Sequence, residues 1–218
     1  MTLTKAINYR RAVRNYDPDK HIDPNTVRKC IEQATLAPNS SNLQLWEFYH
    51  ITSQNKLKKI SKYCLDQPAA KTAKQMLVVV VRKDLWKKRV IANIENLKKA
   101  FGTKDPKDYN KKEKFAFQYY EKLVPITYFD LFGILGWIKY FSFWIIGLFK
   151  PIYRQSRGSD MRIVAHKSAG LAAQTFMLSM ADVGYDTCPM EGIDTLRIKK
   201  RVNIKTWGQL FKFINLLT

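Results

Sequence analysis

The sequence predicts a single α+β domain over residues 1–218, and three stretches carry that prediction. Residues 24–36 place apolar side chains at helical spacing. Met76–Val81 is an uninterrupted apolar run rich in valine, which is typical of a central strand buried on both faces. A long helix is predicted from about residue 159 to Val183. The chain is 46% hydrophobic, which is too apolar for a disordered protein and sufficient for one sizeable core.

The N-terminal part is predicted to alternate helices, loops and strands. Asp23 is the expected N-cap of the first of these helices, with Pro24 at its first position. A polar loop, Pro38–Asn42, follows, and Trp46–Ile51 is predicted as a strand. A short helix is expected over residues 55–63, before the buried strand.

The middle of the chain is strongly basic, and we expect a helical excursion there at about residues 86–155. Between Arg82 and Lys122 the sequence holds 13 Lys and Arg against 6 Asp and Glu. Two helices, about 86–101 and 109–122, are predicted on either side of a turn that contains glycine and proline.

The C-terminal part begins with the long helix. Ser159 or Asp160 is predicted to cap it, and Gly184 to end it as a C′ glycine. A short strand is expected over Tyr185–Met190, followed by a last basic helix, Thr195–Arg201, that is capped by Asp194.

An apolar block lies inside the excursion. Leu131–Phe149 holds 19 residues with one charge, Lys139. Its length is just enough to cross a bilayer core, but the central lysine and three glycines bring its insertion free energy close to zero. Three hypotheses follow: the block packs against a partner subunit, rests on a membrane surface with help from nearby cations, or spans the membrane.

The net charge and the cysteine and histidine spacing limit the classes of ligand that we expect the protein to bind. The chain has 38 Lys and Arg against 18 Asp and Glu, a net charge of +20, which attracts phosphorylated cofactors, nucleic acid or anionic lipid. Nucleic-acid binding is not expected, because no zinc module, helix-turn-helix or RNP motif is present. The three cysteines and three histidines show no metal-ligand spacing, so no metal is predicted. The charged N-terminus lacks an apolar signal region, which predicts a cytoplasmic protein.

Three short motifs carry the chemistry. Arg10-Arg11-Ala12-Val13-Arg14 presents guanidinium groups that grip phosphate in two places at once. Ala37–Trp46 offers small hydroxyl and amide groups after a helix. Cys188–Asp194 ends a strand with a glycine that allows close backbone approach to a flat ligand. Taken one by one, each is also compatible with ordinary surface arginines or with ordinary turns.

In this order the three motifs make the sequence similar to the nitroreductase family of flavin-dependent oxidoreductases, over residues 1 to about 200. The family box R-[RH]-[SA]-x-[RK]-x-[FY] matches Arg10–Tyr16, and the turn P-x-E-G-[FI]-D matches Pro189–Asp194. The loop A-P-S-S-x-N-x-Q-P-W corresponds to Ala37–Trp46, with Leu45 in the place of its proline. The resemblance implies a central, mainly antiparallel sheet flanked by helices, in an intertwined homodimer that holds two FMN molecules at the subunit interface.

The resemblance also implies site residues. It makes Arg10, Arg11 and Arg14 contacts to the FMN phosphate and to the pyrimidine edge of the ring, and Ala12 a backbone contact. Arg14 is the candidate for the positive charge that stabilises the reduced flavin. The contacts supplied by the other subunit are Asn39, Ser40 and Asn42.

A second set is implied beside the flavin ring. Gln67 is expected to face the flavin, and the turn contributes Pro189, Met190, Glu191 and Gly192. The backbone N–H of Gly192 is expected to reach flavin N5, and Glu191 and Gly192 are the candidate catalytic pair together with Arg14.

The C-terminus departs from the family pattern by about twenty missing residues. The family places another core strand after the last helix, and then a cation on the FMN phosphate. Two hypotheses follow. Lys212 stands in for that cation, or the strand is absent and FMN binding is impaired.

The function implied by the resemblance is hydride transfer from NADH or NADPH through the flavin to a quinone, a nitroaromatic or a similar acceptor, in two half-reactions. The cofactor carries this chemistry, which fits the absence of a catalytic triad or metal motif. The alternatives are a non-catalytic or impaired flavin or ligand binder with the same fold, and a basic membrane-associated protein.

Overall fold

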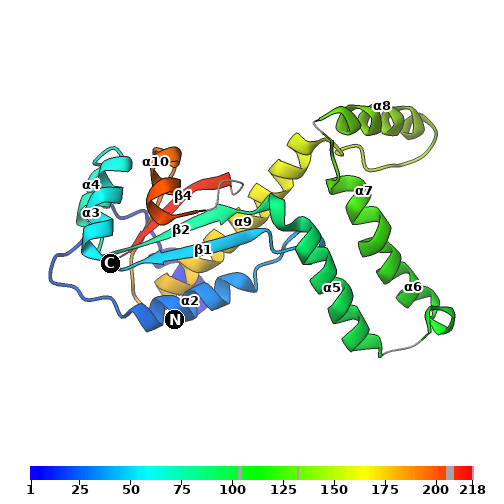
Figure 1. Ribbon diagram of the computed structural model, residues 1–218. Helices are drawn as coiled ribbons and strands as arrows, with labels where there is room; N and C mark the ends of the chain where they lie inside the picture. The colour runs from blue at the N-terminus through cyan, green and yellow to red at the C-terminus, as the bar shows by residue number, and fades with distance from the viewer. Residues whose placement is uncertain (103–104, 132, 205–208, 218) are drawn as a thin grey trace. The chain divides into compact units, whose positions relative to one another are not determined.

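The computed structural model describes residues 1–102, 105–131, 133–204 and 209–217. The chain divides into two compact units (Figure 1). The first unit contains Met1–Pro38, Trp46–Arg82 and Ser168–Thr218, and the second contains Asn39–Leu45 and Lys83–Lys167. The segment that we predict as an excursion lies within the second unit, and the single-domain organisation stays a prediction.

A four-stranded sheet forms the centre of the first unit. Its order is β1-β2-β4-β3, and each neighbouring pair is antiparallel. The strands are β1 (Trp46–Ile51), β2 (Gln75–Val81), β3 (Thr187–Met190) and β4 (Gln209–Leu217). The predicted central antiparallel sheet is therefore confirmed. β3 begins two residues later than predicted. It lies at the edge of the sheet, where a proline such as Pro189 is tolerated because its missing N–H can face away from the neighbouring strand.

The last strand is present, so the hypothesis that it is absent is wrong. β4 lies between β2 and β3, and Ile214 pairs with Val78 on one side and with Met190 on the other. The sequence after the last helix is short, but the segment Gln209–Leu217, six of whose nine residues are Leu, Phe or Ile, forms a full strand. Chain length alone did not reveal this, because strand pairing is decided by distant partners. Lys212 lies within β4, and its side chain is outside the described residues.

Helices cover both faces of this sheet (Figure 1). On one face lie α2 (Pro24–Thr35) and the C-terminal part of α9 (Gly158–Asp182). The other face carries α3 (Gln54–Tyr63), α4 (Pro68–Thr72) and α10 (Thr195–Val202). A short helix, α1 (Leu3–Tyr9), opens the chain.

The helix ends of the first unit follow local sequence signals. The Asp23 carboxylate accepts hydrogen bonds from the N–H groups of Asn25 and Thr26, and Asp194 caps α10 in the same manner, as predicted. Gly184 ends α9 with a φ of 80°. The predicted cap of α9 is wrong: the helix begins at Gly158, and Asp160 lies in its first turn, where its carboxylate accepts from the Arg157 N–H.

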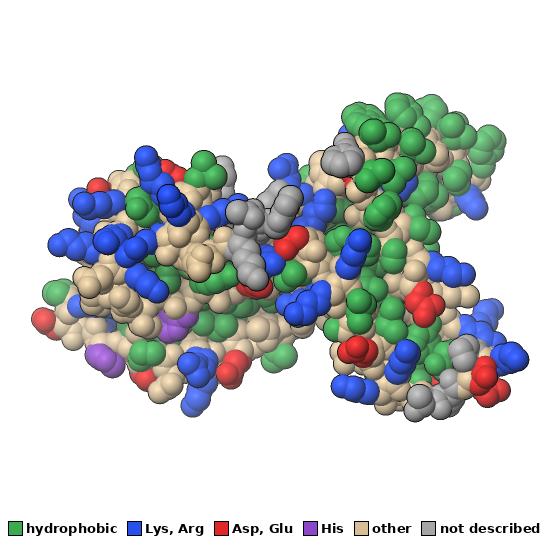
Figure 2. All heavy atoms as spheres, in the orientation of Figure 1, with side chains coloured by type: hydrophobic (Ala, Val, Ile, Leu, Met, Phe, Trp, Pro, Cys, Tyr) green, Lys and Arg blue, Asp and Glu red, His purple; other side chains and the backbone are tan. Residues whose placement is uncertain are grey.

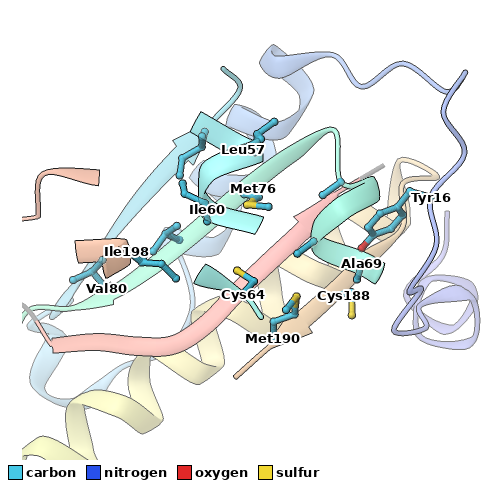
Figure 3. Packing of buried hydrophobic residues seen from close by; sticks show 14 of the residues in the cluster. Tyr16, Leu57, Ile60, Cys64, Ala69, Met76, Val80, Cys188, Met190 and Ile198 are labelled. Atoms are coloured by element: carbon cyan, nitrogen blue, oxygen red, sulfur yellow. The ribbon is translucent and has the colours of Figure 1, made fainter. Parts of the chain in front are cut away.

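The core packs against the buried strand β2, all seven residues of which are buried. Alternate side chains point to opposite faces. On the face drawn in Figure 3, Met76 and Val80 lie among Leu57 and Ile60 of α3 and Ile198 of α10. This confirms the prediction that residues 76–81 form a strand covered on both sides.

The second unit is helical over its longer segment. Its elements are η2 (Lys83–Leu85), α5 (Trp86–Phe101), η3 (Pro106–Asp108), α6 (Lys111–Gln118), η4 (Tyr119–Leu123), α7 (Val124–Tyr128), α8 (Ile134–Phe149) and the start of α9. α5 agrees with the prediction. The helix predicted over 109–122 starts instead after Asn110, which forms a capping box with Glu113, and it continues through the π-helical η4 to Tyr128.

The apolar block forms a shorter helix than its 19 residues suggest. α8 has 16 residues and follows Gly133, whose φ of 85° breaks the backbone before the helix. Over the residues that the structure describes, no helix has the length and apolar character needed to cross a bilayer.

His50 predicts a pH dependence of stability. Its Nε2 lies 2.6 Å from Gln75 Oε1, and Gln75 Nε2 donates to the carbonyl of Ile22 at 2.9 Å. Burial lowers the pKa of His50 below its usual 6.5, and Arg28 adds to this, while the hydrogen bond to Gln75 opposes it. Between the folded and unfolded pKa values the unfolded chain binds more protons, so acid favours unfolding.

We therefore expect the stability contributed by neutral His50 to be complete above about pH 6.5 and to fall as the pH drops below that value. Urea unfolding of the wild type and of His50→Gln across this range measures the effect. The difference in unfolding free energy between the two should change with pH. A constant difference would show that protonation of His50 is not linked to unfolding.

Candidate functional site

The N-terminal arginine motif is joined to the edge strand of the first unit. Ala12 forms a parallel bridge with Thr187 of β3, and the Val13 N–H donates to the Thr187 carbonyl at 3.3 Å. The Tyr16 N–H donates to Thr72 Oγ1 at 3.2 Å. These backbone contacts place Arg14 next to the end of β3.

A cavity of about 260 Å³ lies at this place. It brings together residues that are far apart in the chain, namely Arg14, Gln67, Pro68, Ala69, Cys188, Pro189, Met190 and Glu191. Five of these residues were predicted from the sequence as site residues: Arg14, Gln67, Pro189, Met190 and Glu191. The cavity therefore has a cation, an amide and a carboxylate around a partly apolar floor.

A single side-chain hydrogen bond joins two loops at this cavity. Gln67 Nε2 donates to the Gly192 carbonyl at 3.0 Å, across 125 residues of sequence. Gln67 is held just before α4 by Leu65 and Asp66, whose φ values of 57° and 51° are left-handed. A Cβ at Gly192 would lie 3.1 Å from Gln67 Nε2, so glycine permits this close approach.

Cys188 also lines the cavity, and sequence reasoning did not single it out as a site residue. Burial raises the pKa of the Cys188 thiol, and Arg14 partly opposes this effect. The thiol therefore stays protonated near neutral pH and contributes a weakly polar surface, not a nucleophile.

The other arginines of the motif lie outside this lining. Arg10 caps the C-terminal end of α1, and Arg11 Nη1 donates to the Arg10 carbonyl at 2.8 Å. Ala12 contributes backbone to the bridge with β3. Arg10 and Arg11 lie four and three positions before Arg14 in the chain, so this segment carries three positive charges within five residues.

The predicted polar loop belongs to the second unit. Ser41, Asn42 and Gln44 have left-handed φ values of 54°, 46° and 46°. Three non-glycine residues in this region within four positions store backbone strain, which folded proteins hold chiefly at functional sites. Asn39 Oδ1 accepts from the Gln44 N–H at 2.8 Å and closes the loop on itself.

Three residues that sequence reasoning missed hold this loop in place. Tyr119 Oη lies 2.7 Å from Ser41 Oγ, and Tyr120 Oη donates to the Ser41 carbonyl at 3.1 Å. Both tyrosines belong to η4, and π-helical turns occur often at functional sites. No local pattern could identify them, because they lie 78 and 79 residues from Ser41.

The third residue is Asn93 of α5, which is 8% exposed. Asn42 Nδ2 donates to Asn93 Oδ1 at 3.2 Å, and Asn93 Nδ2 donates back to the Asn42 carbonyl at 3.0 Å. Asn42 is a predicted FMN contact, and its amide is already engaged in this exchange. Asn39 and Ser40 lie on the same loop.

Replacing Asn93 by alanine should destabilise the protein by about 1–3 kcal/mol, because the partner groups on Asn42 lose their hydrogen bonds. Urea unfolding measures this loss. Asn96→Ala, on the exposed side of the same helix, is the matched control and should change stability by about 0.5 kcal/mol or less. Equal effects of the two changes would contradict the role given to the Asn42–Asn93 exchange.

The solved structures that resemble this chain share its α+β fold. A Bacillus subtilis protein described as a "putative nitroreductase", YdfN, superposes with a TM-score of 0.70 at 22% identity, covering 98% of this chain and 86% of its own. A protein from Exiguobacterium sibiricum, solved in complex with FMN, gives a TM-score of 0.65 at 20% identity, covering 100% of this chain and 87% of its own.

The sequence comparisons define the class more closely. The model of the nitroreductase family matches residues 7–216. Protein DrgA of Synechocystis is 25% identical over 204 residues, 94% of this chain and 78% of DrgA. "Putative NAD(P)H nitroreductase MhqN" of Bacillus subtilis is 24% identical over 203 residues, 93% of this chain and 81% of MhqN. The protein is an oxidoreductase by class, and it belongs to the nitroreductase family.

Proposed function

We propose that the protein is an FMN-dependent NAD(P)H oxidoreductase that uses the cavity at the end of β3. The observation that carries the proposal is the meeting of Arg14, Gln67 and the 189–191 turn around one cavity of about 260 Å³. These groups come from all parts of the first unit and include both a cation and an amide. The relatives named as NAD(P)H nitroreductases and the FMN complex of a similar fold support the same assignment.

The residues present fit a flavin. Beside the cavity, Gly192 leaves room for the Gln67 amide, since a Cβ there would lie 3.1 Å from Gln67 Nε2. Within the lining, Arg14 offers a guanidinium for an anionic ring edge or phosphate. Arg14 would bind the pyrimidine edge, and Arg10 and Arg11 would hold the phosphate. The cofactor would also be contacted by Ala12, through its backbone, and by Pro189, Met190 and Glu191. Lys212 remains the proposed substitute for the C-terminal cation that the family places on the FMN phosphate.

Bound FMN would supply the redox chemistry, taking a hydride from NADH or NADPH and delivering it to an acceptor. Gln67 donates to the Gly192 carbonyl, and this hydrogen bond would hold the turn so that the N–H of Gly192 could face a ligand. Arg14 would hold positive charge beside the bound cofactor and so favour its reduction. Over the residues that the structure describes, no three His, Cys, Asp or Glu side chains gather as the ligands of a metal ion would.

The proposal includes a homodimer. Asn39, Ser40 and Asn42 of one protomer would complete the flavin site of its partner, as the family resemblance implies. The strain and the hydrogen bonds of this loop support that role, because a loop held rigidly before binding loses less entropy when a ligand arrives. The acceptor class that we propose is a quinone or a nitroaromatic compound.

The experiment is the visible absorption spectrum of the desalted protein after incubation with FMN, before and after anaerobic addition of NADH or NADPH. We expect retained flavin bands that bleach with the nucleotide and return when a quinone or air is admitted. A protein that retains no FMN would overturn the proposal. A protein that retains FMN but does not bleach with either nucleotide would support the second reading, a non-catalytic flavin binder on the same fold.

A further inference from the structure

We propose that the outer face of α8 docks into the surface of an anionic lipid bilayer, with the helix lying in the membrane plane. This inference goes beyond the oxidoreductase function and does not depend on it. It rests on the distribution of apolar side chains, hydrogen bonds and cations around α8, all of which lie within the second unit.

The outer face of α8 is apolar and open to solvent. Its exposed aliphatic and phenylalanine side chains are 54% to 84% exposed: Ile134, Ile138, Phe141, Ile145, Leu148 and Phe149. Trp137 and Trp144 are exposed on the same side, at 53% and 50%. At about 100° per residue these positions fall within an arc of about 140°. Figure 2 shows hydrophobic side chains covering the visible face of α8.

The inner face of α8 is fixed to the rest of the unit. Gly136 is the buried residue of the helix, and its N–H donates to Asp130 Oδ1 at 2.9 Å. Lys139 Nζ donates to the carbonyls of Ile126 and Phe129, at 3.0 and 2.8 Å, at the end of α7. Lys139, the one charged residue of α8, therefore points toward α7, and the outer face of the helix carries no charged side chain.

Cations lie at the margin of this apolar face. Lys150 follows α8 directly and is exposed, whereas Arg154 lies against Gly147, outside the apolar arc, and donates to the Gly147 carbonyl. The Arg157 guanidinium lies 5.5 Å from the ring centroid of Trp137 and 4.9 Å from that of Tyr140. Tryptophan and tyrosine favour the headgroup level of a bilayer, where cations meet lipid phosphates.

The charge of the unit favours lipid over a second copy of the chain. Residues 83–167 hold 18 Lys and Arg against 8 Asp and Glu, a net charge of +10. Lys and Arg around the apolar face oppose the burial of this face against its own copy, whereas anionic headgroups attract the same cations. At about 1.5 Å per residue the helix is roughly 24 Å long, which suits a position in the membrane plane.

The test uses co-sedimentation of the full-length protein with phosphatidylcholine vesicles, with and without phosphatidylglycerol. We expect binding to the anionic vesicles that weakens with salt. Phe141→Ser combined with Ile145→Ser should lower partitioning by about tenfold or more, since two side chains that would insert are removed. The control is Leu36→Ser combined with Leu196→Ser, which removes apolar side chains that are 83% and 77% exposed in the first unit and should leave binding unchanged.

A second measurement identifies the inserted face. Lipids brominated in the acyl chains should quench tryptophan fluorescence in the wild type. Trp137→Phe combined with Trp144→Phe should lose most of this quenching while the protein still sediments with vesicles. Far-UV circular dichroism of each variant confirms that it is folded.

Three outcomes would overturn the proposal. The first is a wild type that does not sediment with anionic vesicles. The second is a folded serine double variant that binds vesicles as the wild type does. The third is a serine double variant that dissociates a dimer in analytical ultracentrifugation with vesicle binding unchanged, which would assign the face to a second copy. The FMN spectrum is recorded on the same samples, so failure of the flavin proposal is seen separately.

Discussion

Arg14→Gln should raise the Kd for FMN by about tenfold or more. Arg14 lines the cavity at the end of β3, and a hydrogen bond to a charged group is worth about 1.5–3 kcal/mol. Its loss also removes positive charge next to Cys188 and to the 189–191 turn. We expect slower bleaching of the flavin by NADH or NADPH in the variant, even when FMN is saturating. Fluorescence titration of the apoprotein gives the Kd, and stopped-flow absorption gives the rate.

Arg28→Gln is the matched control for this prediction. Arg28 is an exposed arginine of α2 in the same unit, and its replacement removes the same charge without touching the cavity. We expect its Kd for FMN to remain within about twofold of the wild type at moderate salt. If the two variants weaken FMN equally, the effect is one of net charge, and the assignment of Arg14 to the flavin is wrong.

Ile214→Pro should unfold the protein or lower its unfolding free energy by on the order of 3 kcal/mol or more. Ile214 lies in β4 and is paired with β2 and β3 at once. Proline removes the backbone N–H from this central position, leaves a partner carbonyl without its hydrogen bond, and does not fit a strand flanked on both sides. Urea unfolding followed by circular dichroism measures the change.

Ile214→Val is the conservative comparison, because it keeps the N–H and the β-branched shape. We expect it to cost much less than the proline change, because the backbone pairing with β2 and β3 is kept. If the proline and valine variants unfold at the same urea concentration, β4 is not an internal strand. The hypothesis of an impaired C-terminus would then return, with its consequence for FMN binding.

These two predictions test different properties of one unit. The β4 prediction asks whether the sheet is complete, and the Arg14 prediction asks whether the edge of that sheet binds a flavin. A complete sheet with a weak flavin site would indicate a binder or an impaired member of the family. A protein that binds flavin tightly but whose flavin is not reduced by NADH or NADPH would also be a flavin binder without the oxidoreductase activity.

The sequence by itself determined the local elements. Asp23 with Pro24 predicted the start of α2, and the uninterrupted run Met76–Val81 predicted a strand buried on both faces. These predictions were confirmed because capping and periodicity depend on residues within a few positions. The order of three motifs also predicted the family, which the match over residues 7–216 confirms. The roles of the individual site residues remain proposals.

Only the tertiary structure decided what depends on distant partners. The place of β4 between β2 and β3 corrected the idea of a missing strand, since chain length carries no information on pairing. Gln67 meets Gly192 across 125 residues, and Tyr119 meets Ser41 across 78. Lys139 donates to carbonyls at the end of α7, which leaves the outer face of α8 without a charged side chain. The composition of the block could not show this. In each case the contact is fixed by packing and hydrogen bonds between elements, whose geometry no local pattern encodes.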